Sequence, residues 1–302
     1  MNKLNSFLQY LTQVGGLIPM SNIIFELPPL PYYVTIGQTT YEAGNQHPNR
    51  RNIGIFDLLI VTEGCLYIGE DDKHWEVGPG QSLLLLPDRY HYSTGPCQME
   101  TAFYWIHFDY SGTYRESSEE DYSLPIRHAW SNPYKLKLPQ YTILSNFPRI
   151  ERLLLQLLEY SNQSGSISYW KTQQHFMELI RCVVGEGATT PSTKSVLNLA
   201  EQTEAYLRSH FQENLNNETL SRALNYHPNY IVRCMKDIYK CTPMEYLLQY
   251  RIEQAKLLLI KTEWSVADIG AHVGFQYTPY FSSCFKRHTG LNPLAFRKLH
   301  AD

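Results

Sequence analysis

The sequence of 302 residues lacks the patterns that mark several common classes of protein. No apolar run approaches the roughly 20 residues that a helix needs to cross a bilayer. Six cysteines are present, but none form a C-x-x-C pair, and no group of His and Cys has the spacing of a zinc site. The sequence therefore argues against a membrane protein and against a zinc domain, and we expect buried, reduced thiols.

The motifs of common enzyme classes are missing as well. There is no Gly-rich phosphate loop before a helix, no G-x-S-x-G motif and no pair of carboxylates at a telling position. Residues Met1–Met20 lack the continuous apolar stretch and the small-residue cleavage site of a secretory signal. We therefore expect a cytoplasmic protein that is not an enzyme and that carries no cofactor.

Charge is scarce and unevenly spread. The net charge of −3 argues against a chain that coats nucleic acid along its whole length. Residues 195–302 nevertheless carry 12 Lys and Arg against 10 Asp and Glu, while residues 1–194 carry 14 against 19. This asymmetry has the sign expected of a C-terminal half that faces DNA.

The N-terminal part of the chain has the pattern of short strands. Ile55–Val61 and Gln81–Leu86 are short apolar runs bounded by Gly or Pro, and residues 78–80 form a Gly-Pro-Gly turn. Thr101–Tyr110 alternates its side chains between two faces, as a strand does. Several strands at this spacing predict a small barrel or sandwich.

The rest of the chain has helical periodicity. Two amphipathic helices are predicted at 148–160 and 168–184, and residues 186–195 have the composition of a flexible linker. Further helices are predicted at 196–210, 218–225, 228–239, 243–260, 266–273, 279–287 and 293–299. Thr242-Pro243-Met244-Glu245 has the form of a capping box, and Asn217 and Ser265 are further N-cap candidates.

One arrangement occurs twice in this helical part: a short helix, a tight turn and a second helix. The first copy spans residues 218–239 and the second spans residues 266–288. In such a pair the second helix can enter the major groove of B-DNA. The helix between the copies spans roughly 27 Å at 1.5 Å per residue, which suits successive major grooves about 34 Å apart.

These residues resemble the AraC/XylS family of transcription regulators. The resemblance is carried by Ser265–Arg297, which reads SVADIGAHVGFQYTPYFSSCFKRHTGLNPLAFR. The first copy contributes Tyr230-Ile231, Lys236, Tyr246-Leu247, Arg251, Ala255 and Leu258-Leu259. The sequence departs from the family pattern at His227 and Tyr277, where Ser usually caps a recognition helix, and near Lys240-Cys241, where Gly usually follows the first recognition helix. We expect Thr278 to take over the second cap.

The resemblance implies which side chains read DNA. The base-edge readers would be Asn229, Val232 and Arg233 in the first copy, and Thr278, Pro279 and Ser283 in the second. Arg233 can bond a guanine edge with two hydrogen bonds, Asn229 suits adenine, and Val232 and Pro279 can make only apolar contacts. Lys286 and Arg287 are candidates for phosphate contacts. The alternative for each charged residue is an ordinary solvated surface position, and for Asn229 and Thr278 it is a helix cap.

The N-terminal part resembles the cupin-like ligand domains that are fused to many members of this family. Val77–His91, VGPGQSLLLLPDRYH, carries the resemblance. Metal-holding cupins usually have a His-x-His motif, and none occurs here. The only imidazoles expected in the barrel are those of His47, His91 and His107. We therefore predict no metal site.

A small polar effector is the expected ligand of this domain, and a sugar is the leading candidate by family analogy. Barrel mouths hold such ligands against aromatic walls with a few placed polar groups. The candidate contacts are Arg51, His91, Trp105, His107, Tyr32 and Tyr67. Arg51 could instead be an ordinary surface charge, His91 a turn or packing residue, and Trp105 a core residue.

The sequence thus predicts an α+β multidomain protein. It comprises a cupin-like β-barrel for the effector over residues 1–140, a helical hairpin for dimerisation over 141–185, a linker over 186–195 and an all-α double helix-turn-helix domain over 196–302. The expected function is sequence-specific transcription regulation, more often activation, by a homodimer that binds promoter DNA, the effector and RNA polymerase. Two alternatives stay open: a metal-dependent cupin enzyme tethered to DNA, and a constitutive DNA-binding protein whose barrel makes protein contacts.

Overall fold

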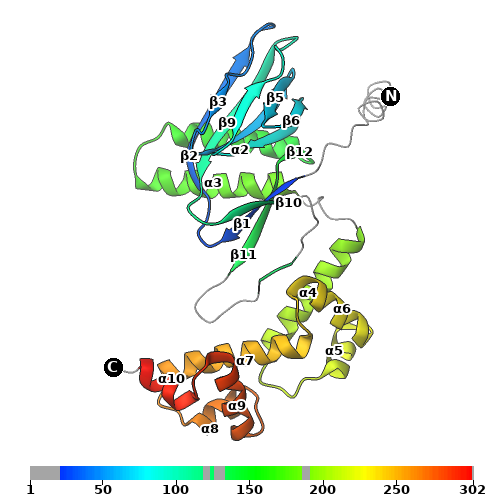
Figure 1. The fold of residues 1–302 in the computed structure, drawn as a ribbon, viewed down its shortest axis with the longest axis vertical. Helices are drawn as coiled ribbons and strands as arrows, with labels where there is room; N and C mark the ends of the chain where they lie inside the picture. The colour runs from blue at the N-terminus through cyan, green and yellow to red at the C-terminus, as the bar shows by residue number, and fades with distance from the viewer. Residues whose placement is uncertain (1–20, 118–122, 126–132, 186–190, 301–302) are drawn as a thin grey trace. The chain divides into compact units, whose positions relative to one another are not determined.

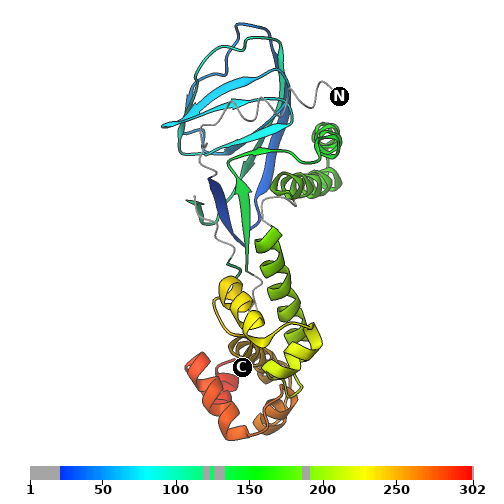
Figure 2. The same cartoon turned by 90° about the vertical axis from the view of Figure 1, so that its right-hand side faces the viewer.

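The protein forms two compact units (Figures 1 and 2). The computed structural model describes residues 21–117, 123–125, 133–185 and 191–300. Strands and two helices make up the first unit, which holds most of the chain up to residue 185. The second unit contains the helices after residue 190. The predicted combination of a strand-rich N-terminal part and a helical C-terminal part is confirmed.

Two antiparallel sheets dominate the first unit. The larger has the strand order β12-β7-β4-β9-β2 and the smaller has the order β3-β8-β5-β6. Their bounds are β2 Tyr32–Tyr41, β3 Arg50–Arg51, β4 Phe56–Glu63, β5 Leu66–Glu70, β6 Lys73–Val77, β7 Gln81–Leu85, β8 Tyr90–Ser93, β9 Thr101–Asp109 and β12 Tyr141–Ile143. β4 lies at the centre of the larger sheet and is buried from Phe56 to Val61, which explains its apolar run, interrupted only by Asp57.

The two sheets enclose one apolar core. Side chains of the larger sheet, such as Leu59 and Phe103, pack with Ile68 and Trp75 of the smaller one. Among the strands that the structure describes, no hydrogen-bonded pair joins the two sheets. The predicted closed barrel is therefore wrong in its closure. Patterns of alternating side chains specify a half-buried strand, but they do not specify which strands pair at the edges.

The described residues before 186 also form a small third sheet and two helices. The sheet has the order β10-β1-β11, with β1 Asn22–Leu27, β10 Tyr114–Ser117 and β11 Tyr134–Pro139. Helices α2 (Phe147–Ser161) and α3 (Ser166–Val184) form a hairpin close to the predicted bounds. Phe176 of α3 lies 5.3 Å from Phe108, measured between ring centroids, and the side chain of Gln173 accepts a hydrogen bond from the Tyr33 N–H. The hairpin thus packs on the larger sheet, and dimerisation through it stays a prediction.

The second unit contains seven helices among its described residues. They are α4 Pro191–Ser209, α5 Asn217–Leu224, α6 Pro228–Tyr239, α7 Pro243–Lys261, α8 Val266–His272, α9 Thr278–Thr289 and α10 Pro293–His300. Part of the predicted linker is helical, because α4 begins at Pro191, and residues 186–190 lie outside the described part of the chain. Residues 1–20, for which the sequence predicts no secretory signal, also lie outside the described part of the chain.

Each helix-turn-helix copy in this unit has a core of its own. The first core is centred on Ile231, Met235 and Ile238 of α6, and the second on Phe281 and Phe285 of α9. Helix α7 contributes Tyr246 and Leu247 to the first core, and Ile252, Ala255 and Leu259 to the second. It is therefore the shared element of the two copies. In the described residues, no helix is both long and apolar enough to span a membrane.

Candidate nucleic-acid interface and ligand cavity

Helices α6 and α9 each present one face to their core and the opposite face to solvent. On α6 the buried face contains Ile231, Cys234, Met235 and Ile238, and on α9 it contains Phe281, Cys284 and Phe285. These positions recur every three or four residues, which is the period of one helix face. The remaining faces are left for another molecule.

The predicted DNA-binding residues lie on those exposed faces. Asn229, Arg233, Thr278, Pro279, Ser283, Lys286 and Arg287 are exposed, and Val232 is half-buried. The Arg233 guanidinium carbon lies 4.9 Å from the centroid of the Tyr230 ring, which in turn lies 5.9 Å from the Tyr226 ring. The structure therefore leaves all eight side chains accessible, and their contacts with DNA stay predictions.

The residues that cap the helix starts agree only partly with the predicted caps. His227 caps α6 by accepting a hydrogen bond of 3.3 Å from the Asn229 N–H through its Nδ1 atom. Tyr277 stands at the N-cap of α9 without a side-chain cap bond, and Thr278 is already the first helical residue. The predicted cap by Thr278 is therefore wrong, and α5 is capped by Asn216 instead of Asn217. The capping box of Thr242 and the cap by Ser265 are confirmed.

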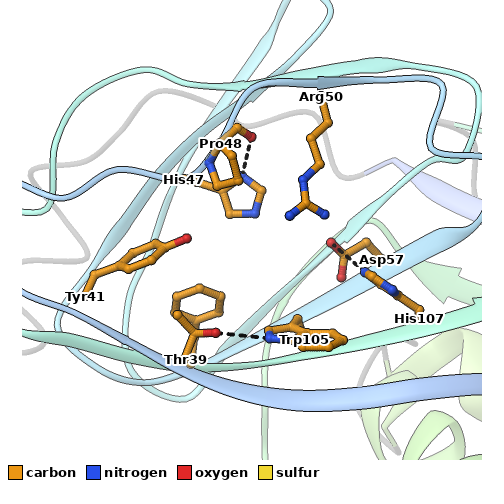
Figure 3. Close-up of a pocket in the computed structure, with 9 residues that line it drawn as sticks. Thr39, Tyr41, His47, Pro48, Arg50, Asp57, Trp105 and His107 are labelled. Atoms are coloured by element: carbon orange, nitrogen blue, oxygen red, sulfur yellow. Dashed lines mark hydrogen bonds and ion pairs between the residues drawn. The ribbon is translucent and has the colours of Figure 1, made fainter.

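A cavity of about 120 Å³ opens in the first unit (Figure 3). The larger sheet supplies its wall and floor, and the segment before β3 supplies its rim. Its lining consists of Thr39, Tyr41, His47, Pro48, Arg50, Asp57, Phe103, Trp105 and His107. Figure 3 shows the side chains of Tyr41, His47 and Arg50 pointing toward a common space beside Trp105. The cavity thus combines aromatic rings with both anionic and cationic groups.

Hydrogen bonds hold the aromatic wall of the cavity in place. Trp105 donates from Nε1 to Oγ1 of Thr39 over 3.1 Å, and its ring centroid lies 4.9 Å from that of His107. Nε2 of His107 lies 3.5 Å from Oδ2 of Asp57. Backbone pairing sets these neighbours, because β4 places Asp57 opposite His107 and β2 places Gly37 opposite Trp105.

Burial keeps the histidine beside the rim neutral. Only 6% of His47 is exposed, and its Nδ1 donates to the carbonyl oxygen of Pro48 over 3.1 Å. Burial lowers the pKa of His47 to about 4, more than the nearby Asp57 carboxylate raises it. At neutral pH the ring is therefore uncharged and keeps a lone pair on Nε2, so it can accept a hydrogen bond there.

Two further polar groups near the cavity are buried without partners. Oδ1 of Asp57 has no hydrogen-bond partner among the described residues, and neither do the two ring nitrogens of His91. His91 is fully buried, and its ring centroid lies 5.6 Å from that of His47. Burial also lowers the pKa of His91. An unsatisfied buried polar group costs about 1–3 kcal/mol, so the unpartnered oxygen of Asp57, which lines the cavity, favours a bound polar molecule there.

The structure brings together only some of the predicted effector contacts. Trp105 and His107 line the cavity, and His91 lies beside His47 without lining it. Arg51 is exposed and stacks on Tyr90 at 4.9 Å, while its neighbour Arg50 lines the cavity.

The two predicted tyrosines lie outside this lining. Tyr32 is exposed and donates to Asp109 over 2.6 Å, and the carbonyl oxygen of Tyr67 accepts from the Thr94 N–H over 3.0 Å. Sequence reasoning missed Tyr41, Arg50 and Asp57 as lining residues. Asp57 is the one charged residue in the apolar run Ile55–Val61, and that is the signal that could have found it.

A metal is not favoured by these residues. Within the described ranges, no group of three or more His, Cys, Asp or Glu side chains has an arrangement that could hold a metal ion. His47, His91 and His107 therefore lie near one another without forming a ligand set.

The chain is similar to known transcriptional regulators. A family model described as a helix-turn-helix domain matches residues 220–299. The chain is 31% identical to the uncharacterized HTH-type transcriptional regulator YisR of Bacillus subtilis (strain 168), over 93% of this chain and 98% of the relative. It is 23% identical to the arabinose operon regulatory protein of Salmonella typhimurium, over 80% of this chain and 83% of the relative. A solved structure, the C-terminal domain of AraT, a response regulator from Geobacillus stearothermophilus, is 29% identical and covers 33% of this chain and 84% of its own, with a TM-score of 0.33.

Proposed function

This chain belongs to the AraC/XylS family of transcriptional regulators, and from that premise we propose that α6 and α9 read promoter DNA under the control of a small ligand in the cavity. The observation that carries the proposal is the solvent-facing side of these two helices. Each places hydrogen-bonding side chains opposite a sealed apolar core, so that the exposed face can enter a groove while the helix stays folded.

Helix α7 supports binding to two successive grooves. Its 19 residues span roughly 28 Å at 1.5 Å per residue. Successive major grooves on one face of B-DNA lie about 34 Å apart. A rigid helix of this length suits two recognition helices on the same side of the duplex. The binding site would then cover about two turns of promoter DNA.

The cavity suits a small polyhydroxylated molecule, and we propose a carbohydrate. The indole of Trp105 offers an apolar face for the C–H surface of a sugar ring. Around it, Asp57 can accept from hydroxyl groups, Arg50 can donate, and the Tyr41 hydroxyl can do both. One relative of similar length is named for an arabinose operon. The unpartnered Asp57 oxygen would then be satisfied by the ligand.

Ligand control requires that the ligand bind two arrangements of the protein with different affinities. We propose that binding in the cavity changes which DNA half-sites a homodimer can reach together, with the α2–α3 hairpin as the dimerisation element. Activation through RNA polymerase is the expected output, and the cytoplasm is the expected compartment because promoter DNA lies there.

A thermal-shift screen of the full chain against a broad panel of monosaccharides and disaccharides tests the ligand. A sugar at 100 times its Kd stabilises the folded protein by about 2.7 kcal/mol, and that stabilisation should disappear in Trp105→Ala and persist in the exposed control Tyr134→Ala. The same sugar should change the affinity for promoter DNA. No shift across the panel would favour a constitutive DNA-binding protein instead.

A further inference from the structure

We propose that the two helix-turn-helix copies read DNA unequally: α6 determines base sequence through Asn229 and Arg233, whereas α9 mainly anchors the phosphate backbone. The inference rests on the proposed DNA-binding function and adds to it a division of roles between the copies. It follows from comparing matched positions of the two recognition helices.

The two copies correspond at an interval of 50 residues. Tyr230 corresponds to Tyr280, Cys234 to Cys284 and Lys236 to Lys286, and each member of a pair has the same burial or exposure as its counterpart, or nearly so. Thr242 and Pro243, which start the helix after α6, correspond to Asn292 and Pro293 after α9. Corresponding side chains on the exposed faces therefore meet the same part of a groove.

The position of Arg233 favours base reading in the first copy. Its guanidinium carbon stands 4.9 Å from the centroid of the Tyr230 ring, and this ring is itself supported by Tyr226. Stacking on an aromatic ring restricts a long side chain before DNA arrives and so reduces the entropy lost on binding. An exposed guanidinium held in this way can form two hydrogen bonds with the O6 and N7 atoms of guanine.

The second copy keeps the aromatic ring but lacks the groups that discriminate between bases. Ser283 corresponds to Arg233, and a serine hydroxyl can bond to donors and acceptors alike. Pro279 corresponds to Asn229, and a proline side chain has no hydrogen-bonding atom. Tyr280, the counterpart of Tyr230, is 58% exposed and has no cation from position 283 beside it.

The charged side chains of the two recognition helices favour phosphate binding by the second copy. Helix α6 has Lys236 followed by Asp237, whereas α9 has Lys286 followed by Arg287, and all four side chains are exposed. Asp237 would repel a phosphate at the position where Arg287 attracts one. The second copy is therefore better suited to sequence-independent anchoring than the first.

The experiment starts from a DNA site selected with the full chain. Duplexes that each carry one base-pair substitution in this site then compete with it for the protein. Substitutions in the half-site read by α6 should weaken binding by roughly 5- to 150-fold. Those in the other half-site should weaken it by less than about 3-fold, which is below the effect of one good base contact. Arg233→Ala should remove the preference at one position and thereby assign the half-site to α6.

Three further variants extend the test. Ser283→Arg places a guanidinium beside Tyr280 and should create a guanine preference of roughly 5-fold or more in the second half-site. Lys236→Ala and Lys286→Ala, at matched positions, should weaken binding without changing any base preference, and each should lower the salt slope by about 1. Equal discrimination in both half-sites would overturn the inference. A wild-type chain that selects no site at all would overturn the DNA-reading function itself.

Discussion

The guanidinium of Arg251, in the middle of α7, donates a hydrogen bond of 2.7 Å from Nε to the carbonyl oxygen of Phe211, 40 positions earlier in the chain. A second bond of 2.6 Å joins its Nη2 to the carbonyl oxygen of Glu213. The guanidinium carbon also lies 5.8 Å from the ring centroid of Phe275 in the turn between α8 and α9. One side chain thus ties the segment before α5 to the turn of the second helix-turn-helix copy.

Arg251→Lys should loosen the connection between the two copies. Lysine cannot make both hydrogen bonds in this geometry, and a bond from a charged donor contributes about 1.5–3 kcal/mol. We expect the free energy of unfolding of the helical unit to fall by about 2–4 kcal/mol. We also expect affinity to fall more for duplexes with two half-sites than for duplexes with one. Denaturant unfolding and gel-shift titrations check the two effects, and Arg222→Lys on the exposed side of α5 is the control for stability.

Tyr246→Phe should destabilise the first helix-turn-helix copy. The Tyr246 hydroxyl is buried and donates to Oε1 of Glu204 over 2.8 Å, and burial and the Glu204 carboxylate both raise the pKa of this tyrosine. Removing the donor leaves a carboxylate oxygen with Arg208 as its remaining partner, at a cost of about 1–3 kcal/mol. Unfolding of the helical unit followed by circular dichroism measures the change. Tyr226→Phe, at an exposed site, should have no comparable effect.

As the pH falls from 6.5 to 4, His47 should make a destabilising contribution to the strand-rich unit, opposed by Glu70, whose pKa burial raises to about 7. Burial lowers the pKa of His47 to about 4, so in this window the unfolded chain binds a proton that the folded chain does not. The stabilisation from the neutral ring is present above pH 6.5 and is lost as the pH falls toward 4, by about 3 kcal/mol at most. His47→Gln should remove the His47 contribution, so that acid lowers the free energy of unfolding less in this variant than in the wild type over this range. The same dependence in His47→Gln and in the exposed control His74→Gln would contradict this assignment.

Gly37→Ala should abolish ligand binding in the cavity. A Cβ atom at position 37 would lie 2.1 Å from Cζ2 of Trp105, so the indole would have to leave its place on the cavity wall. We expect the thermal stabilisation by the effector to be lost in this variant. Gly95→Ala is the matched control, since a Cβ atom there meets no heavy atom within 4 Å. Full ligand stabilisation in Gly37→Ala would show that Trp105 is not part of the binding wall.

Much of the helical unit could be predicted because its signals are local. The capping box at Thr242, the cap at Ser265 and the spacing of Phe281 and Phe285 each depend on residues less than two turns apart. The cap at α9 was misplaced because Tyr277 adopts an extended N-cap backbone without using its side chain. An N-cap residue that makes no side-chain hydrogen bond can be of many types, so the sequence does not indicate its position.

The cavity was harder to predict because it depends on the pairing of distant strands. Asp57 meets His107 only through the register of β4 with β9, and the sequence does not state that register. The choice between Arg50 and Arg51 depends on which of two alternating faces of β3 turns toward the cavity. Trp105 and His107 were found together because they share one face of a single strand.

Selection of bound duplexes from a random-sequence pool, with the full wild-type chain, tests the central claim most directly. If α6 and α9 enter successive major grooves, the selected duplexes will contain a strong motif read by α6 and, about one helical turn away, a weaker preference at the half-site of α9. They will lose one base preference when Arg233→Ala is used in parallel. If the pool is not enriched and binding only weakens as salt rises, the contact with DNA is non-specific, and the account of sequence reading by the helix-turn-helix copies would be contradicted.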